Sequence, residues 1–354
     1  MADGAALDYV RDQVGRALDE FLRRQRGVLP GATAELLPGL DALSGLLAGG
    51  KRLRPAFCYW GWRGTGAMDC PQLIRAAAAL ELLHASALVH DDVMDSSDTR
   101  RGQPSLHRRF AAYHAELGWR GSAESFGMGA AILMGDLLLS WTDEMFHSSG
   151  LALDALSRGQ RVLDLMRSEV MAGQYLDLLA QATGDGSVAS ALRVVEYKTA
   201  KYTIERPLHL GAALAGAAGG IPRAYTDYGL PLGVAFQLRD DILGMFGDPA
   251  KTGKPASDDL REGKRTVLLA ITQARATPQQ AAIIDRTLGD PNLDEAGVAN
   301  VRGVITSTGA LAECELMIDR HLARALDALK DAPITAEARD ALAELAVAAT
   351  ARHD

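Results

Sequence analysis

Apolar residues recur every three or four positions along most of the chain, as they do in amphipathic helices. Between residues 6 and 24, for example, Leu7, Val10, Val14 and Leu18 lie at helical spacing with charged residues between them. No stretch shows the strict alternation of apolar and polar residues, bounded by turn residues, that is typical of strands. The pattern therefore predicts an all-α fold.

The same periodicity continues to the end of the chain, interrupted by short polar or Gly/Pro-containing loops. No low-complexity linker and no internal repeat divides the sequence, so we expect residues 1–354 to form a single domain. Besides the helix over residues 6–24, the expected helices cover residues 33–47, 71–95, 122–147, 151–181, 208–218, 228–238, 267–275, 278–288, 293–307, 310–329 and 335–349.

One of these helices changes character abruptly near its end. Residues 74–89 are almost all apolar, which predicts a buried helix, and Asp91, Asp92 and Asp95 then follow together. Asp91 and Asp95 are four apart and so project from one helix face. An acidic run is more often a solvated face, but a solvated face would accompany the apolar face along the whole helix. Carboxylates at the end of a buried helix suit Mg²⁺, which is typically held by one or two carboxylates together with substrate phosphates.

Basic residues lie at two places near this acidic motif. Arg100 and Arg101 follow it in a polar loop, where they could clamp a diphosphate or merely form weak surface ion pairs. Residues 49–55 join two glycines to three cations, including Lys51 and Arg54, at the start of the next helix. Glycines that let the backbone turn, together with exposed N–H groups and cations, favour an anion site over a solvated turn.

A second acidic motif repeats this arrangement. The helix expected over residues 228–238 ends in Asp240 and Asp241, and a loop containing Lys254 and Lys264 follows. Two acidic helix ends, each followed by cations, would rarely arise by chance among solvent-exposed charges. If they face each other across a cavity, they could hold several divalent ions around one diphosphate.

Composition indicates which kind of ligand and which cellular compartment to expect. The net charge of -8 and the few, local cations favour a small anionic ligand over nucleic acid. Cys58, Cys70 and Cys314 show neither metal-ligand nor redox spacing, which favours the reducing cytoplasm. The N-terminus has no signal-peptide pattern, and the apolar stretches over residues 76–89 and 208–220 are too short or interrupted, so we expect no transmembrane segment.

Taken together, the motifs resemble those of the trans-isoprenyl diphosphate synthases of the polyprenyl synthetase family. The resemblance covers roughly residues 45–270 and rests on five blocks. These are Gly-Gly-Lys-Arg-x-Arg-Pro at 49–55, Asp-Asp-x-x-Asp at 91–95 with His84 before it and Arg-Arg-Gly after it, Lys-Thr at 198–199, Phe-Gln-x-x-Asp-Asp at 236–241, and Gly-Lys-Pro at 253–255. The family resemblance implies a helical bundle around a deep central cavity, normally homodimeric, that condenses isopentenyl diphosphate with an allylic diphosphate.

The resemblance also implies roles for individual residues. Isopentenyl diphosphate would be bound by Lys51, Arg54, His84 and Arg101. Mg²⁺, expected as three ions per active site, would be bound by Asp91, Asp92, Asp95, Asp240 and Asp241, which together with Lys198 form the expected catalytic set. The allylic diphosphate would be bound by Arg100, Lys198, Thr199, Gln237 and Lys254. Charge stabilisation of a departing diphosphate needs no protein nucleophile, and the sequence shows none.

One position departs from the family pattern. Many members have a third Asp in the second motif, where this chain has Gly244. Asp248 follows four residues later, beyond Gly247, and is a poor substitute. We expect the activity to be retained, with weaker metal affinity.

Small residues precede the first motif and predict the product length. Ala87 lies one helical turn before Asp91, Leu83 nearly two turns before it, and Ser86 beside them. A bulky ring at these positions stops growth at C15 in the family, so we expect a product of C20, geranylgeranyl diphosphate, or somewhat longer. Small residues could equally serve close helix packing, and a farnesyl diphosphate synthase remains an alternative.

Two other functions use similar features. A class I terpene cyclase would share the acidic helices and Mg²⁺, but it would not need the anion site of residues 49–55 or His84. A non-catalytic subunit of a hetero-oligomeric synthase is favoured only by Gly244.

Overall fold

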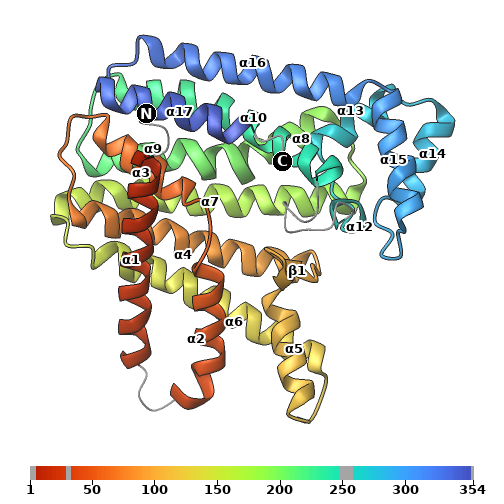
Figure 1. Ribbon diagram of the computed structural model, residues 1–354, viewed down its shortest axis with the longest axis horizontal. Coiled ribbons are helices and arrows are strands. Elements are labelled where there is room, and N and C mark those ends of the chain that lie inside the picture. The colour runs from red at the N-terminus through yellow and green to blue at the C-terminus, as the bar shows by residue number, and fades with distance from the viewer. Residues whose placement is uncertain (1–4, 29–32, 248–257, 352–354) are drawn as a thin grey trace. The chain divides into compact units, whose positions relative to one another are not determined.

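The computed structural model describes residues 5–28, 33–247 and 258–351 (Figure 1). Within these residues every element is a helix except for one two-stranded hairpin, which confirms the all-α prediction. The chain divides into two compact units, the first comprising Met1–Gln160 with Leu210–Gly216 and the second Arg161–His209 with Ala217–Asp354. The expectation of a single domain stays a prediction.

The first unit is built around one long buried helix, α4. Ala76, Ala77, Ala78 and Ala79 are completely buried, because neighbouring helices cover this helix on several sides. α6 packs along it most extensively, and α1, α2, α3 and α5 also contact it. The elements of this unit are α1 (Ala5–Val28), α2 (Thr33–Leu47), α3 (Leu53–Arg63), α4 (Pro71–Met94), β1 (Thr99–Arg100), β2 (Gln103–Pro104), α5 (Leu106–Glu116) and α6 (Ala123–His147).

Small residues on α6 bring it close to its neighbours. Gly127, Ala131 and Gly135 are four apart and all buried, so they form one packing face. A Cβ at Gly127 would lie 2.3 Å from the backbone oxygen of His107 in α5, and one at Gly135 would lie 2.2 Å from Nε2 of His90 in α4. The opposite face of α6 is left exposed.

The second unit has its core between α10, α13, α15 and α16, where Leu238, Val267, Ile305 and Ile318 are among the buried residues. α10 packs against both α16 and the π-helix η1. α16 in turn packs on α17 (Figure 1). The elements are η1 (Val195–Glu205), α7 (Leu153–Thr183), which begins in the first unit, α8 (Val188–Val194), α9 (Arg206–Leu214), which ends in the first unit, α10 (Ile221–Phe246), α12 (Asp258–Arg261), α13 (Val267–Arg275), α14 (Pro278–Thr287), α15 (Glu295–Ser307), α16 (Ala310–Lys330) and α17 (Ala336–Thr350).

The predicted helix boundaries mostly hold to within a few residues, with one correction that affects the site. The helix expected over residues 228–238 does not end before its aspartates. α10 runs from Ile221 to Phe246, so Asp240 and Asp241 lie inside it. The apolar pattern stops at Leu238, but the backbone hydrogen bonds continue because α10 remains packed against α16 and α12.

Among the described residues, two helices, α4 and α6, are long and apolar enough to cross a membrane by length and composition. In α4 the apolar window is 72% buried inside the protein, as expected for a core helix, whereas in α6 it is 39% buried. Length and composition alone are weak evidence for a span. α6 therefore keeps several apolar side chains exposed, among them Met128, Ile132 and Leu133.

Candidate active site

The three carboxylates of the first acidic motif, residues 91–95, lie at the end of α4. Asp91 and Asp92 are in its last turn, and Asp95 caps the helix with its backbone N–H bonded to the carbonyl of Asp91. Asp92 is buried, and its Oδ1 accepts hydrogen bonds from Nε of Arg100, at 2.9 Å, and from Nη2 of the same residue. Arg100 Nη2 also lies 3.5 Å from Asp91 Oδ2. The guanidinium thus binds across two of the predicted metal ligands.

A tight turn directs the two arginines that follow the motif. β1 and β2 pair antiparallel with Arg100 opposite Gln103, and the two residues between them, Arg101 and Gly102, have φ of 54° and 72°. Positive φ at both central positions makes this a type I′ hairpin turn, which suits the glycine and is uncommon for an arginine. Arg100 therefore points to the carboxylates, while Arg101 reaches elsewhere.

Arg101 joins the hairpin to the basic block of residues 49–55. Its Nη1 donates to the carbonyl oxygens of Leu46 at 3.0 Å and Gly49 at 3.1 Å. Gly50 has φ of 120°, and a Cβ there would lie 3.2 Å from Nη2 of Arg101. A left-handed backbone without a side chain is what lets the arginine approach this closely.

Arg52, which the sequence did not single out, is the buried member of this block. Its φ of 51° places it in the left-handed region immediately before α3. Nη1 donates to Oε2 of Glu81 at 2.7 Å, Nη2 donates to the carbonyl of Leu47, and both charged side chains are about 95% buried. The three cations of the block look equivalent in sequence. In the structure the ion pair between Arg52 and Glu81 holds the block against α4, whereas Lys51 is exposed.

His84 lies within the positive field of this region. Burial holds its pKa well below the usual value, and nearby cations push the pKa further in the same direction. These cations are Arg54, Arg101, Arg100 and Arg52. The structure thus brings together His84, Arg54 and Arg101, three of the four residues predicted to bind isopentenyl diphosphate. A neutral histidine among arginines suits an anion with several oxygens.

In the second unit a chain of hydrogen bonds joins η1 to the second acidic motif, residues 240–244. Thr199 Oγ1 donates to Oε1 of Gln237 at 2.6 Å, and Nε2 of Gln237 donates to Oδ1 of Asp241 at 2.8 Å. Burial raises the pKa of Asp241 to about 7; the bond from Gln237 opposes this rise, and the negative charges of Asp259 and Asp240 add to it. Thr199 and Gln237 therefore hold a carboxylate in place.

Lys198 is held by an acidic partner on α7. Its Nζ lies 2.7 Å from Oδ2 of Asp177. The approach is possible because α7 has a glycine here: a Cβ at Gly173 would lie 2.5 Å from the backbone nitrogen of Lys198. Gly173 and Asp177 of α7 therefore orient the lysine predicted to bind the allylic diphosphate.

Glycines also set the distance between η1 and α10. A Cβ at Gly233 would lie 2.3 Å from Cα of Ala200, and one at Gly229 would lie 3.0 Å from Cα of Glu205. The π-helical run is 11 residues long, and such stretches are rare and often functional. The hydrogen-bonded chain from Thr199 to Asp241 depends on this close approach.

The region around Gly244 contains an acidic residue that the sequence did not identify. An ideal Cβ at Gly244 would lie 2.6 Å from Oδ2 of Asp259, which lies in α12. In the printed sequence Asp259 is only one acid in an Asp-Asp-x-x-Glu run, and nothing in its spacing relates it to the second motif. Lys254, predicted to bind the allylic diphosphate, and Asp248 lie outside the described residues.

The donor set fits a hard divalent cation. The acidic motifs supply carboxylate oxygens, which Mg²⁺ prefers. Asp241 is buried, and its Oδ2 makes no hydrogen bond to any described residue, which leaves an oxygen available to an ion. Among the described residues no three His, Cys, Asp or Glu side chains converge as a preformed cage. A cation held here would therefore keep waters or share phosphate oxygens, as Mg²⁺ commonly does.

The predicted product-length residues differ in their surroundings. Leu83 and Ser86 are buried, whereas Ala87 is partly exposed, one turn before Asp91 on the helix face that carries this carboxylate. The burial of Ser86 is compatible with both roles considered for small residues here, so the product-length assignment of these three residues stays a prediction.

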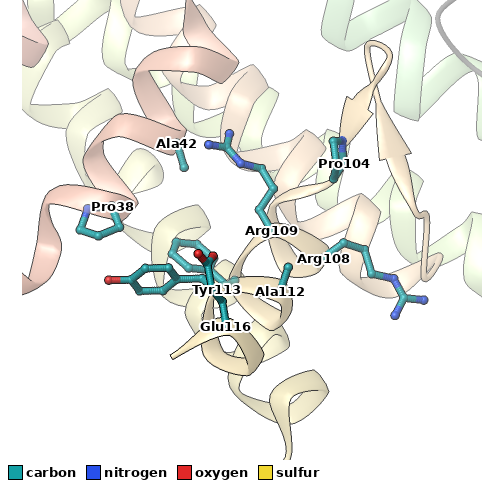
Figure 2. A pocket seen from close by; sticks show the side chains of 9 residues that line it. Pro38, Ala42, Pro104, Arg108, Arg109, Ala112, Tyr113 and Glu116 are labelled. Carbon is teal, nitrogen blue, oxygen red and sulfur yellow. The ribbon is translucent and has the colours of Figure 1, made fainter. Parts of the chain in front are cut away.

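A separate pocket of about 330 Å³ lies between α2, β2 and α5 (Figure 2). Its lining includes Pro38 of α2, Pro104 of β2 and Tyr113 of α5, with Arg108 and Arg109 pointing in different directions from α5. Arg108 donates to Asp98 at 2.7 Å. None of the predicted site residues lines this pocket, so it is not a continuation of the site.

Comparison with known proteins agrees with these motifs. The polyprenyl synthetase family model matches residues 40–305. The geranylfarnesyl diphosphate synthase of Aeropyrum pernix is 34% identical over 85% of this chain and 92% of its own length. Component 2 of the heptaprenyl diphosphate synthase of Geobacillus stearothermophilus is 34% identical over 87% of this chain and 88% of its own.

Among solved structures, a geranylgeranyl pyrophosphate synthase from Corynebacterium glutamicum, complexed with isoprenyl diphosphate and magnesium, covers 100% of both chains at 40% identity with a TM-score of 0.93. The extent of the family match and the identity to these relatives leave one conclusion: this chain belongs to the polyprenyl synthetase family and is a prenyltransferase.

Proposed function

We propose that the chain catalyses the Mg²⁺-dependent head-to-tail condensation of isopentenyl diphosphate with an allylic diphosphate, giving geranylgeranyl diphosphate or a somewhat longer all-trans product. The carbon–oxygen bond of the allylic diphosphate breaks, and a bond forms between its C1 and C4 of isopentenyl diphosphate. The proton lost from the second substrate leaves with the released diphosphate.

One observation carries this proposal. A partly buried His84 in the field of four arginines lies on the same helix as the first acidic motif, two turns before it. This arrangement gives one anion site next to a second site that can take a metal-bound diphosphate. A class I terpene cyclase needs only the second of these sites, so the basic region favours a two-substrate reaction.

The residues of the first unit have distinct tasks in this reaction. Arg54, Arg101 and His84, together with the exposed Lys51, bind the diphosphate of isopentenyl diphosphate. Arg100, now bonded to Asp92, turns to the departing allylic diphosphate. Once they are bound to the substrates, these cations stabilise the negative charge that develops on the leaving group.

The residues of the second unit act on the allylic diphosphate. Lys198 donates to its oxygens, and Thr199 and Gln237 keep Asp241 oriented. Asp91, Asp92, Asp95, Asp240 and Asp241 would hold the Mg²⁺ ions, three of them in our proposal. When bound, these ions neutralise the diphosphate and so weaken its bond to carbon.

The product length follows from the residues below the first motif. Ala87 is small and partly exposed, so a growing chain can pass it. The geranylgeranyl and geranylfarnesyl synthases among the similar proteins support a product of C20 or longer. We further propose that the protein is cytoplasmic, in line with its free cysteines Cys58, Cys70 and Cys314, and that it is a homodimer.

A second function deserves a test because one relative is named as a component of a heptaprenyl diphosphate synthase. A chain of that kind could need a partner protein. In the sequence only Gly244 favours a non-catalytic subunit.

Product analysis tests the proposal. The purified protein is incubated with Mg²⁺, isopentenyl diphosphate and each allylic primer in turn, and the dephosphorylated products are sized. We expect a C20 alcohol or a somewhat longer one, no product after chelation of the metal, and turnover about 100- to 1000-fold lower for Asp240→Ala, because a charge-stabilising group is removed. A cyclic hydrocarbon would indicate a cyclase, and no product from the chain alone would indicate a subunit.

A further inference from the structure

The second acidic motif lacks its third carboxylate in sequence, yet the structure places a carboxylate at that point. Gly244 is inside α10, and the Cβ of any other residue there would lie 2.6 Å from Oδ2 of Asp259. A side chain on residue 244 would shift the Asp259 carboxylate, the free end of a flexible side chain, from the position that it now occupies. The absence of a side chain at Gly244 thus leaves room for the carboxylate of Asp259.

Asp259 is held in this position by its own short helix. The next residue, Leu260, is completely buried, and its carbonyl accepts a 2.7 Å hydrogen bond from the backbone of Gly289. Arg261 donates to the carbonyl of Leu293 at 2.8 Å. These contacts anchor α12 to the second unit, so the approach of Asp259 to Gly244 does not depend on a mobile side chain alone.

Within the described part of the chain, the charge of Asp259 is only loosely balanced. Nζ of Lys264 lies 3.8 Å from its Oδ1, and that ammonium is 2.6 Å from Oε2 of Glu262. The negative charge of Asp259 also helps to raise the pKa of Asp241. Oδ2 of Asp241 is buried and makes no hydrogen bond to a described residue. Carboxylates gathered this closely repel one another unless a cation lies among them.

We propose that Asp259 replaces the third aspartate of the second acidic motif and binds, together with Asp240 and Asp241, the divalent cation that accompanies the diphosphate. Because the described residues form no preformed cage, Asp259 contacts the hydrated ion and adds the charge that Gly244 lacks. The assignment rests on the proposed function for its ligand, but it concerns metal binding and not turnover.

The test measures Mn²⁺ binding by electron paramagnetic resonance in the presence of inorganic pyrophosphate. Asp259→Asn keeps the size of the side chain and removes its charge, and we expect Mn²⁺ affinity to fall about 10- to 100-fold. Asp258→Asn is the matched control, because Asp258 carries the same charge one residue earlier and pairs with Arg261 on its own helix at 3.7 Å. We expect its Mn²⁺ affinity to stay within about twofold of the wild type.

A double variant, Asp259→Ala with Gly244→Asp, moves the carboxylate to the usual place in the motif. Affinity should recover to within about threefold of the wild type, since the charge returns to the same region. Unchanged affinity in Asp259→Asn, an equal loss in Asp258→Asn, or no recovery in a double variant with normal melting temperature would each overturn the assignment. Wild-type protein that binds Mn²⁺ with pyrophosphate but forms no prenyl product would contradict the proposed function and leave the assignment of Asp259 intact.

Discussion

Arg52 and Lys51 are neighbours in one basic block, but the fold treats them differently. Arg52 takes a left-handed backbone conformation and is buried against Glu81, while Lys51 stays exposed. The sequence motifs and the family resemblance predicted roles for Lys51, Arg54 and His84 because these residue types carry recognisable chemistry. The sequence could not identify the position of Arg52, because its partner Glu81 is 29 residues away. It could not identify Asp259 either, because this residue lies beside Gly244 of another helix.

A single substitution on α4 tests the product-length assignment at the same scale. Ala87→Phe should shorten the product by about one isoprene unit, to C15, since a ring one turn below Asp91 blocks a chain that grows by roughly one helical turn per unit. Product sizing by chromatography measures the change. Ala87 is the better site for this test because it is partly exposed, whereas a ring at the buried Ser86 risks overpacking.

Ala87→Ser is the control and should leave the product at the wild-type length. An unchanged product from Ala87→Phe, with normal melting temperature, would show that the floor of the site lies on another element.

At the scale of elements, periodicity predicted the long helices well, because each has one apolar face against a core. It did not predict α5, whose buried residues are two histidines, His107 and His114, beside Leu106 and Phe110. It also gave no sign that Val195–Glu205 is π-helical. The π-helix depends on close packing against α10, which is a tertiary effect. The same is true of the end of α10, which lies beyond its aspartates because neighbouring helices support it.

The packing of η1 on α10 yields a prediction about Gly233. Gly233→Ala puts a methyl group 2.3 Å from Cα of Ala200, where backbone must move, so we expect it to destabilise the protein by about 1–3 kcal/mol and to lower activity by loosening the bond between Thr199 and Gln237. Chemical denaturation and turnover measure the two effects.

Gly303→Ala is the matched control, because Gly303 is also helical, in α15, and has nothing within 4 Å of its added Cβ. That variant should be neutral or stabilise by up to about 1 kcal/mol. Equal behaviour of the two alanine variants would contradict a special role for the packing at Gly233.

At the scale of the whole molecule, α6 presents an apolar face without a covering element among the described residues. Met128, Ile132 and Leu133 are exposed on it, and Phe126 lies beside Trp119 with 5.3 Å between the ring centroids. The opposite face of α6 packs on α4 and α5. Exposed apolar patches of this kind mark interaction surfaces, and for a protein proposed to be a homodimer the simplest partner is a second copy.

Leu133→Asp should weaken this association, because it places a charge on the patch at its most exposed leucine. We expect the dimer dissociation constant to rise at least about tenfold, as seen by light scattering across a dilution series. Leu153→Asp is the control, since Leu153 is 85% exposed at the start of α7 and away from this face. A wild-type monomer, or equal dissociation of both variants, would contradict the proposed interface.

The cations assigned to the allylic diphosphate are already engaged with carboxylates of the protein. Arg100 pairs with Asp92, and Lys198 pairs with Asp177 at 2.7 Å. In the proposed reaction an arriving diphosphate exchanges one anionic partner for another, so the protein never leaves these cations buried without a counter-charge. If the reaction is the proposed one, the same carboxylates also compete with the diphosphate of the finished product. We expect this competition for the head group to favour release of a product whose long apolar tail would otherwise hold it on the protein.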